Sequence, residues 1–191
     1  MTISKGGNGM GNIISLHGNV SESDDSLKVS NGLTDVLIDY LLLSGSELAD
    51  TDSKKRLVAF LTDKQQTVIG LGNVGFMITE MPWQAETFNE DREFMLHVTD
   101  HAAALSKDEA IWDMIGYKPD RMLLDYALNG FRNLIDHMTE EHIDRAILAE
   151  WLQDQEATEI SGYEKCPKHG LIMSQLGCKF CNDSSQTLVK L

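Results

Sequence analysis

The chain has 191 residues, of which 42% are hydrophobic, so it can form one folded domain with a small accessory segment and is not globally disordered. With 30 acidic and 16 basic residues it carries a formal charge of −14, which argues against a sequence-independent grip on nucleic-acid phosphates and favours a basic partner. No stretch approaches the roughly 20 apolar residues of a membrane span, and the three cysteines cluster near the C-terminus, so we expect a cytoplasmic protein without a disulfide framework.

The N-terminal third of the chain is predicted to begin with a flexible leader. Gly, Ser, Asn and Asp dominate residues 1–31, with one short ordered piece expected at 12–16. Apolar residues at three- and four-residue spacing then predict a helix from Leu33, with Thr34 as its N-cap and Gly45 as its end or a kink. A second helix, capped by Ser53, is predicted to pair with the first as a hairpin.

Residues 66–80 have a different pattern, which predicts a short β-hairpin or edge strand packed on the helices. Within them, Gly70, Gly72 and Gly75 match the G-x-G-x-x-G fingerprint, in which glycines let the backbone approach a pyrophosphate. The fingerprint should open a series of strand–helix–strand units, whereas helices are predicted on both sides here. We therefore favour a glycine-rich turn and keep nucleotide binding by this loop as an alternative.

Further helices are predicted between residue 89 and about residue 157. Their boundary residues are predicted to be Asn89, Ser106, Glu109, Gly116, Pro119 and Thr139. The helix that begins at Pro119 is predicted to bury one face. That face carries Leu123, Tyr126, Ala127, Phe131, Leu134 and Met138.

The C-terminal region contains a metal-ligand pattern. Cys166 and His169 are separated by two residues, and so are Cys178 and Cys181. Thiolates and an imidazole in two such pairs are what tetrahedral Zn²⁺ requires. The pattern resembles the short zinc ribbons and zinc knuckles over residues 164–183, a resemblance that carries no particular activity. Because all four positions would be protein ligands, we expect a structural Zn²⁺ ion rather than a catalytic one.

Two other groups of polar residues are candidate sites. His97 and His101 lie four residues apart on a predicted helix and could share a metal with Asp100, but no H-E-x-x-H pattern supplies a general base, so surface histidines are the favoured interpretation. Acidic residues accumulate between 136 and 159. They predict either a solvated helix face or a docking surface for a basic partner.

Together these patterns predict a mainly α protein, α+β at most, with a short β-hairpin or edge strand and a small zinc-binding module. The predicted division is a leader (1–31), a helical domain (32–157), a linker (158–164), the zinc-binding module (165–183) and a tail (184–191).

The function expected from the sequence is protein–protein interaction by an acidic cytoplasmic protein of the inhibitor, immunity or adaptor type. No catalytic residue is assigned. Two alternatives stay open: a nucleotide-binding enzyme that uses the loop from Gly70 to Gly75, and a nucleic-acid-associated regulator whose zinc tail contacts DNA or RNA.

Overall fold

A computed structural model describes residues 12–18, 25–66, 75–154, 162–173 and 177–182. Helices dominate these residues, which confirms the predicted mainly helical class. The helices are α1 (Asn31–Leu48), α2 (Asp52–Gln66), α3 (Phe88–Leu105), α4 (Glu109–Ile115), α5 (Arg121–His137) and α6 (Arg145–Asp154). The strands are β1 (Asn12–Ser15) and β2 (Ser26–Val29), and 3₁₀ turns span Ile78–Glu80, Ala85–Thr87 and Glu140–His142.

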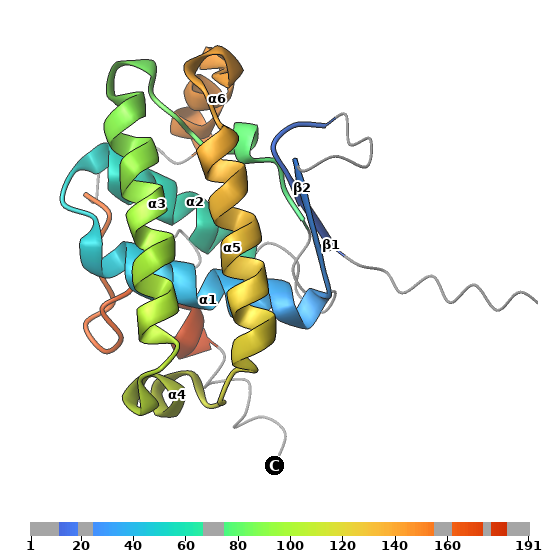
Figure 1. Cartoon of the computed structure of the whole chain (residues 1–191). Helices are drawn as coiled ribbons and strands as arrows, with labels where there is room; N and C mark the ends of the chain where they lie inside the picture. The colour runs from blue at the N-terminus through green and yellow to red at the C-terminus, as the bar shows by residue number, and fades with distance from the viewer. Residues whose placement is uncertain (1–11, 19–24, 67–74, 155–161, 174–176, 183–191) are drawn as a thin grey trace, which may run out of the picture.

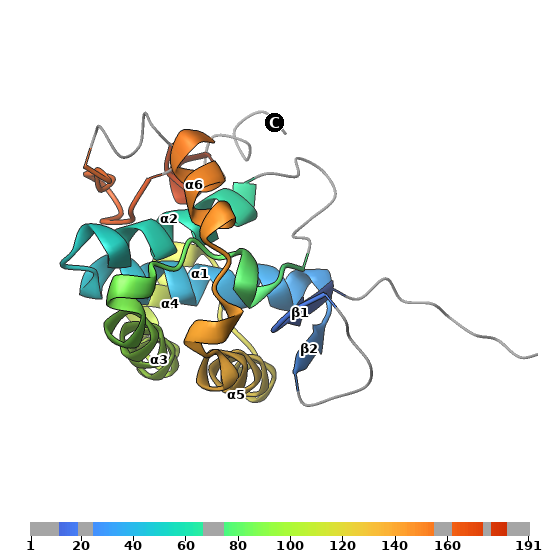
Figure 2. The same cartoon turned by 90° about the horizontal axis from the view of Figure 1, so that it is seen from above.

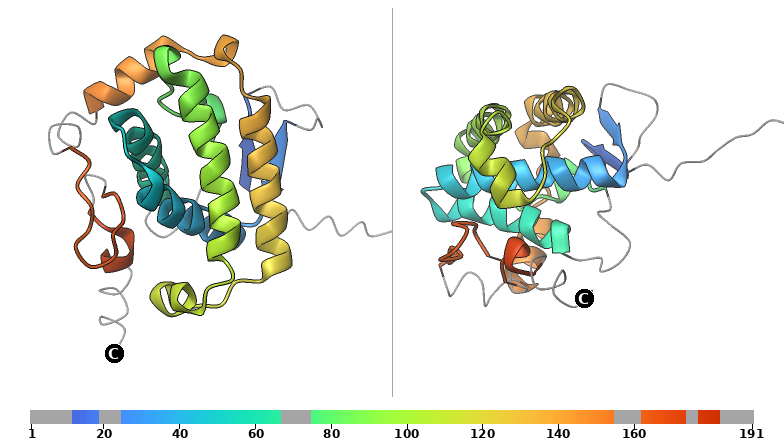
Figure 3. Two further views of the ribbon diagram at one scale, coloured as in Figure 1. Left: turned by 60° about the vertical axis from the view of Figure 1, so that its left-hand side comes forward. Right: turned by 90° about the horizontal axis from the view of Figure 1, so that it is seen from below.

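The elements stack in three layers (Figures 1 and 2). Helices α3 and α5 lie side by side in the first layer, and α1 and α2 cross them steeply in the second. The third layer is the C-terminal module, by which we mean residues 162–173 and 177–182. It covers the face of α1 and α2 that is turned away from α3 and α5 (Figure 3). Helix α1 is therefore covered on both sides, which explains why it is apolar nearly all round.

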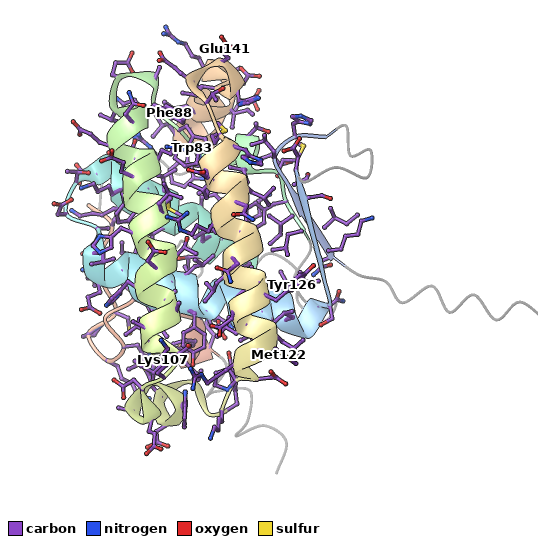
Figure 4. All side chains as sticks on the ribbon, viewed as in Figure 1. Trp83, Phe88, Lys107, Met122, Tyr126 and Glu141 are labelled. Atoms are coloured by element: carbon purple, nitrogen blue, oxygen red, sulfur yellow. The ribbon has the colours of Figure 1, made fainter. Side chains whose placement is uncertain are left out.

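Trp83 is the largest of the fully buried side chains in the described residues. Trp83 is 1% exposed, and its indole Nε1 donates a hydrogen bond to the Ile78 carbonyl oxygen at 2.8 Å. Its ring meets the edge of Phe88 with the centroids 5.8 Å apart, in the region between the upper parts of α3 and α5 (Figure 4). The buried indole thus keeps its polar atom satisfied while it fills the core.

The strands lie in a different place from the one predicted. Strand β1 occupies the short ordered piece expected at 12–16 and pairs antiparallel with β2, with Asn12 opposite Val29. Of the predicted hairpin region, residues 67–74 lie outside the described residues. The chain that follows runs along β1 as an edge: the Ser15 amide donates to the Phe76 carbonyl at 3.1 Å, and Met77 forms a single parallel bridge with Ser15.

Helix α1 begins and ends at different residues from those predicted. Its N-cap is Ser30, whose hydroxyl accepts from the Leu33 amide at 3.2 Å, and the predicted cap Thr34 lies inside the helix. Gly45 does not end the helix, which continues to Leu48. A Cβ at Gly45 would lie 2.7 Å from a methyl group of Val58, so this glycine permits the close contact between α1 and α2.

The boundaries of the later helices were predicted less well than their existence. Asp108 caps α4 in place of Ser106, whereas Gly116 ends the helix in a left-handed conformation (φ 79°), as predicted. Asp120 caps α5, so Pro119 precedes the helix instead of beginning it. The last long helix expected after Thr139 is a 3₁₀ turn followed by the shorter α6.

The predicted buried face of α5 is wrong at two positions. Leu123 is 48% exposed and Tyr126 is 57% exposed, and their neighbour Met122 is 77% exposed. Figure 4 shows Met122 and Tyr126 on the first turns of α5. The face that packs inward is rotated and carries Leu124, Ala127, Leu128, Phe131, Leu134 and Ile135. This leaves an exposed apolar surface at one end of the helix.

Candidate metal centre

The four predicted ligands converge in the C-terminal module. His169 Nδ1 lies 3.8, 3.4 and 3.5 Å from the sulfurs of Cys166, Cys178 and Cys181, and the sulfurs of Cys166 and Cys181 are 3.7 Å apart. A tetrahedral ion with bonds of about 2.3 Å to sulfur and about 2.0 Å to nitrogen separates its ligands by about 3.5–3.8 Å. A disulfide needs sulfurs only about 2.05 Å apart. Of the His, Cys, Asp and Glu groups in the described residues, this cluster could hold a metal ion.

The first ligand pair is held by a tight turn. The Cys166 amide donates to the Leu171 carbonyl and the Gly170 amide donates back to the Cys166 carbonyl, both at 2.8 Å. Lys165 and Ile172 form an antiparallel bridge just outside this turn. Gly170 adopts φ 69°, a conformation that L-residues with a side chain rarely take, so the sequence Cys-Pro-Lys-His-Gly suits this turn.

In the second ligand pair, Cys181 lies on one helical turn at residues 179–182. Cys178 precedes this turn, and its carbonyl accepts from the Asn182 amide at 3.1 Å. The Phe180 ring packs edge-on against the His169 imidazole, with centroids 5.7 Å apart and planes at 85°. The two predicted ligand pairs thus also meet through an aromatic contact.

The module is joined to the helical body through one backbone position. The Ile172 amide donates to the hydroxyl of Ser46 on α1 at 2.9 Å, and the Ile172 carbonyl accepts from the hydroxyl of Thr62 on α2 at 3.2 Å. All three residues are buried. Both backbone polar groups of Ile172 are therefore met by side chains from the two helices beneath it, and the Thr62 hydroxyl shares its one proton between the carbonyls of Ile172 and Val58, the latter at 3.1 Å.

A buried carboxylate makes a second junction. Asp39 on α1 is 3% exposed, and its Oδ1 accepts an ion-paired hydrogen bond from Lys179, which lies between Cys178 and Cys181. Its Oδ2 accepts from the Tyr117 hydroxyl at 3.1 Å. Burial, followed by the charge of Asp39, raises the pKa of Tyr117 far above its ordinary value, so the phenol remains a donor.

The electrostatics of the cluster favour a cation. Burial raises the pKa of the Cys178 thiol to about 12, and Cys166 adds to this rise. Burial also opposes ionisation of Cys166, yet backbone amides of His169 and Lys168 donate to its sulfur and leave its pKa below the ordinary value. Burial, with the charge of Lys168, lowers the pKa of His169, so the imidazole is neutral, as a ligand must be. Burial thus opposes a thiolate at Cys178, and a cation between the sulfurs would offset that opposition.

The other candidate sites do not gather into a metal centre among the described residues. His97 is exposed on α3. His101 is half-buried, with Nδ1 3.1 Å from the Ser44 hydroxyl and Nε2 4.0 Å from the Glu47 carboxylate. Because the Ser44 hydroxyl donates its proton to the Val98 carbonyl at 2.7 Å, it can only accept from the histidine.

Of the glycine fingerprint, Gly70 and Gly72 lie outside the described residues. Gly75 has a structural role: a Cβ there would lie 1.8 Å from the carbonyl oxygen of Ile13 on β1. Its lack of a side chain is required by strand packing, and this requirement holds with or without a nucleotide.

The residues that dock the module were not identified from the sequence. They are Asp39, Ser46, Thr62, Tyr117 and Lys179. One signal was available for the first of them: Asp39 interrupts the most apolar run of the chain, from Leu33 to Leu43, where a charged residue needs a partner.

No family model, curated protein or solved structure matches this chain. In the described part of the chain, none of the helices combines the length and the apolar character that crossing a membrane requires.

Proposed function

We propose that this protein binds Zn²⁺ as a structural ion and acts through contact with another protein. The observation that supports the metal is the closed cluster of three thiols and one imidazole, spaced as a tetrahedral ion would space them. This donor set suits Zn²⁺, and a site whose four positions are all protein ligands has none left for water or substrate. The ion would fix the two ligand pairs of the C-terminal module to each other.

Elemental analysis of the purified protein tests the metal. We expect close to one zinc per chain, and loss of that zinc in the variant that carries Cys178→Ser and Cys181→Ser. Freshly purified wild-type protein without zinc, or with iron in its place, would contradict this part of the proposal.

The support for a protein partner is the exposed apolar surface on α5. We call Met122, Leu123 and Tyr126 the α5 patch; they are 77%, 48% and 57% exposed on the first two turns of the helix. Met and Tyr are enriched at the centres of protein interfaces, and contiguous exposed apolar side chains mark interaction surfaces. The patch lies on α5 and the metal cluster on the opposite side of α1, so partner binding and metal binding use different surfaces.

The charge of the chain indicates the chemistry of the partner. The net charge is −14, and Asp120 and Asp125 flank the α5 patch, with Arg121 beside them. A partner that places an apolar side chain on the patch and surrounds it with lysines or arginines would satisfy both features. We therefore propose a basic protein as the occupant of the α5 patch.

Affinity capture tests this partner with a matched control. The variant with Met122→Ser and Tyr126→Ser should lose a basic protein that wild type retains, whereas Ile13→Thr, which alters an exposed apolar residue on β1, should retain it. Retention should fall when NaCl is raised from about 50 mM to about 500 mM, because screening weakens contacts between exposed charges. Equal capture by wild type and the patch variant, or capture of acidic proteins alone, would contradict the proposal.

A further inference from the structure

We propose that Asp39 and Tyr117 are positioning residues for the metal site: they hold Lys179 of the Cys178-Lys179-Phe180-Cys181 turn against α1, so that residues of the helical body set the metal affinity. This inference rests on the proposed metal site and adds to it a dependence on residues that are not ligands. The observation behind it is the position of Lys179. In the sequence it lies between the predicted ligands Cys178 and Cys181, and in the structure its side chain contacts α1 of the helical body.

Lys179 reaches into the body and away from solvent. Its side chain is 13% exposed and that of Asp39 is 5% exposed. The short helical turn at 179–182 presents Lys179 to α1, while the cysteines on either side of it face the cluster. The contact between Lys179 and Asp39 therefore limits the positions and orientations that the turn can take on α1.

The positive charge of Lys179 stabilises the buried carboxylate of Asp39. Removing the opposite charge from a buried carboxylate is costly, because the low-dielectric interior compensates a charge less well than water does. Asp39 comes from α1, Tyr117 from the connection between α4 and α5, and Lys179 from the module. The three elements thus meet at the Asp39 carboxylate. Because this carboxylate is stabilised by the charge of Lys179, orientations of the second ligand pair in which Lys179 points toward α1 are favoured.

Restricting a ligand pair in advance strengthens metal binding, because less conformational freedom is lost when the ion arrives. The same reasoning applies to groups that orient metal ligands without touching the ion, whose removal weakens metal binding about 10- to 100-fold. We expect an effect of this size for Asp39→Asn and for Lys179→Met.

The test is metal affinity, measured by competition between the full-length protein and a chromophoric zinc chelator. Asp39→Asn and Lys179→Met should each weaken zinc binding at least about 10-fold. The double variant should bind no more weakly than the weaker single variant, since both substitutions remove the same interaction. With Co²⁺ as the probe, the single variants should show altered ligand-field bands, because the second cysteine pair is no longer held in one orientation.

Two control variants separate positioning from charge and from general stability. Lys28→Met removes the same positive charge from an exposed lysine on β2, a strand that lies on the far side of the molecule from the C-terminal module (Figure 2). Ser44→Ala disturbs a buried hydroxyl of α1 that faces α3. Both controls should bind zinc within about twofold of wild type, the scatter expected between independent sites.

Tyr117→Phe is the mild variant in case the stronger ones fail to fold, because it removes a single hydrogen bond to Asp39. It should weaken zinc binding measurably and leave the far-ultraviolet circular dichroism unchanged. The inference is overturned if wild type binds zinc and the folded variants among Asp39→Asn, Lys179→Met and Tyr117→Phe bind it as tightly as the controls. Wild-type protein that binds no zinc contradicts the proposed metal site itself, which is a different outcome.

Discussion

The contact between Ser46 and Ile172 allows a quantitative prediction of how firmly the C-terminal module is attached. In Ser46→Ala the buried Ile172 amide loses the acceptor that lies 2.9 Å away in wild type. An unsatisfied buried donor costs about 1–3 kcal/mol. We therefore expect the free energy of unfolding to fall by about 1–3 kcal/mol.

Ser44→Ala is the matched control, because both serines are buried on α1, one turned toward the module and the other toward α3. The Val98 carbonyl accepts from the Ser44 hydroxyl and from a backbone amide within α3, so it keeps one donor when the hydroxyl is removed. Its other neighbour, His101, is half-buried and can bond water instead. The loss should be about 0.5–1.5 kcal/mol, smaller than for Ser46→Ala.

Urea unfolding of both variants in their metal-loaded forms gives the comparison, with the midpoint and slope fitted for each. A Ser46→Ala variant as stable as wild type, or one less affected than Ser44→Ala, would refute the inference that the Ile172 peptide depends on α1 for its hydrogen bond.

Three further predictions concern packing, titration and the metal. Gly45→Ala should lower the stability of the fold by about 1–3 kcal/mol, because the added methyl group overpacks against Val58. Gly32→Ala should raise it by about 0.5–1 kcal/mol, because a Cβ there meets nothing within 4 Å and alanine favours the helix. Thermal unfolding of both variants checks that the two effects have opposite signs. Burial, followed by the charge of Asp39, raises the pKa of Tyr40 to about 12, so its contribution to stability is present below the ordinary pKa of about 10 and is lost as pH rises through about 12. Tyr40→Phe should lose less stability over that interval, as measured by urea unfolding at each pH. Treatment with a metal chelator should increase hydrogen–deuterium exchange of backbone amides in the C-terminal module and at the buried face of α1 beneath it. An increase confined to the module would contradict the docking described above.

The features that could be predicted from the sequence are local in the chain. The ligand spacing of Cys166, His169, Cys178 and Cys181 identified the candidate metal centre, because a two-residue gap is enough to bring two side chains onto one ion. Three- and four-residue periodicity identified the helices. Gly116 was a correct terminator, because a positive φ at a helix end favours glycine on its own account.

The contacts and buried faces that were missed or mispredicted depend on partners distant in the sequence. Asp39 contacts a residue 140 positions away, and Ser46 contacts one 126 positions away. On helix α5, Ala127, Phe131 and Leu134 belong to both the predicted and the observed buried face, and packing against α1, α3 and β2 determines which of their neighbours are buried with them. Strands of four residues are too short for alternation to be distinguished from a loop.

The way in which the module attaches affects how the metal centre itself is understood. Clustered ligands on a short segment suggest a unit that folds with its own ion. Here the peptide of Ile172 and the side chain of Lys179 find their hydrogen-bonding partners on α1 and α2, while Leu171 and Phe180 are buried as part of the same apolar core as the helices. An ion that joined the two ligand pairs would therefore fix the outer layer of the helical body as well as the module. Loss of such an ion would then expose a carboxylate and two hydroxyls on α1 and α2 whose partners come from the module, and metal binding would be thermodynamically linked to the integrity of that face.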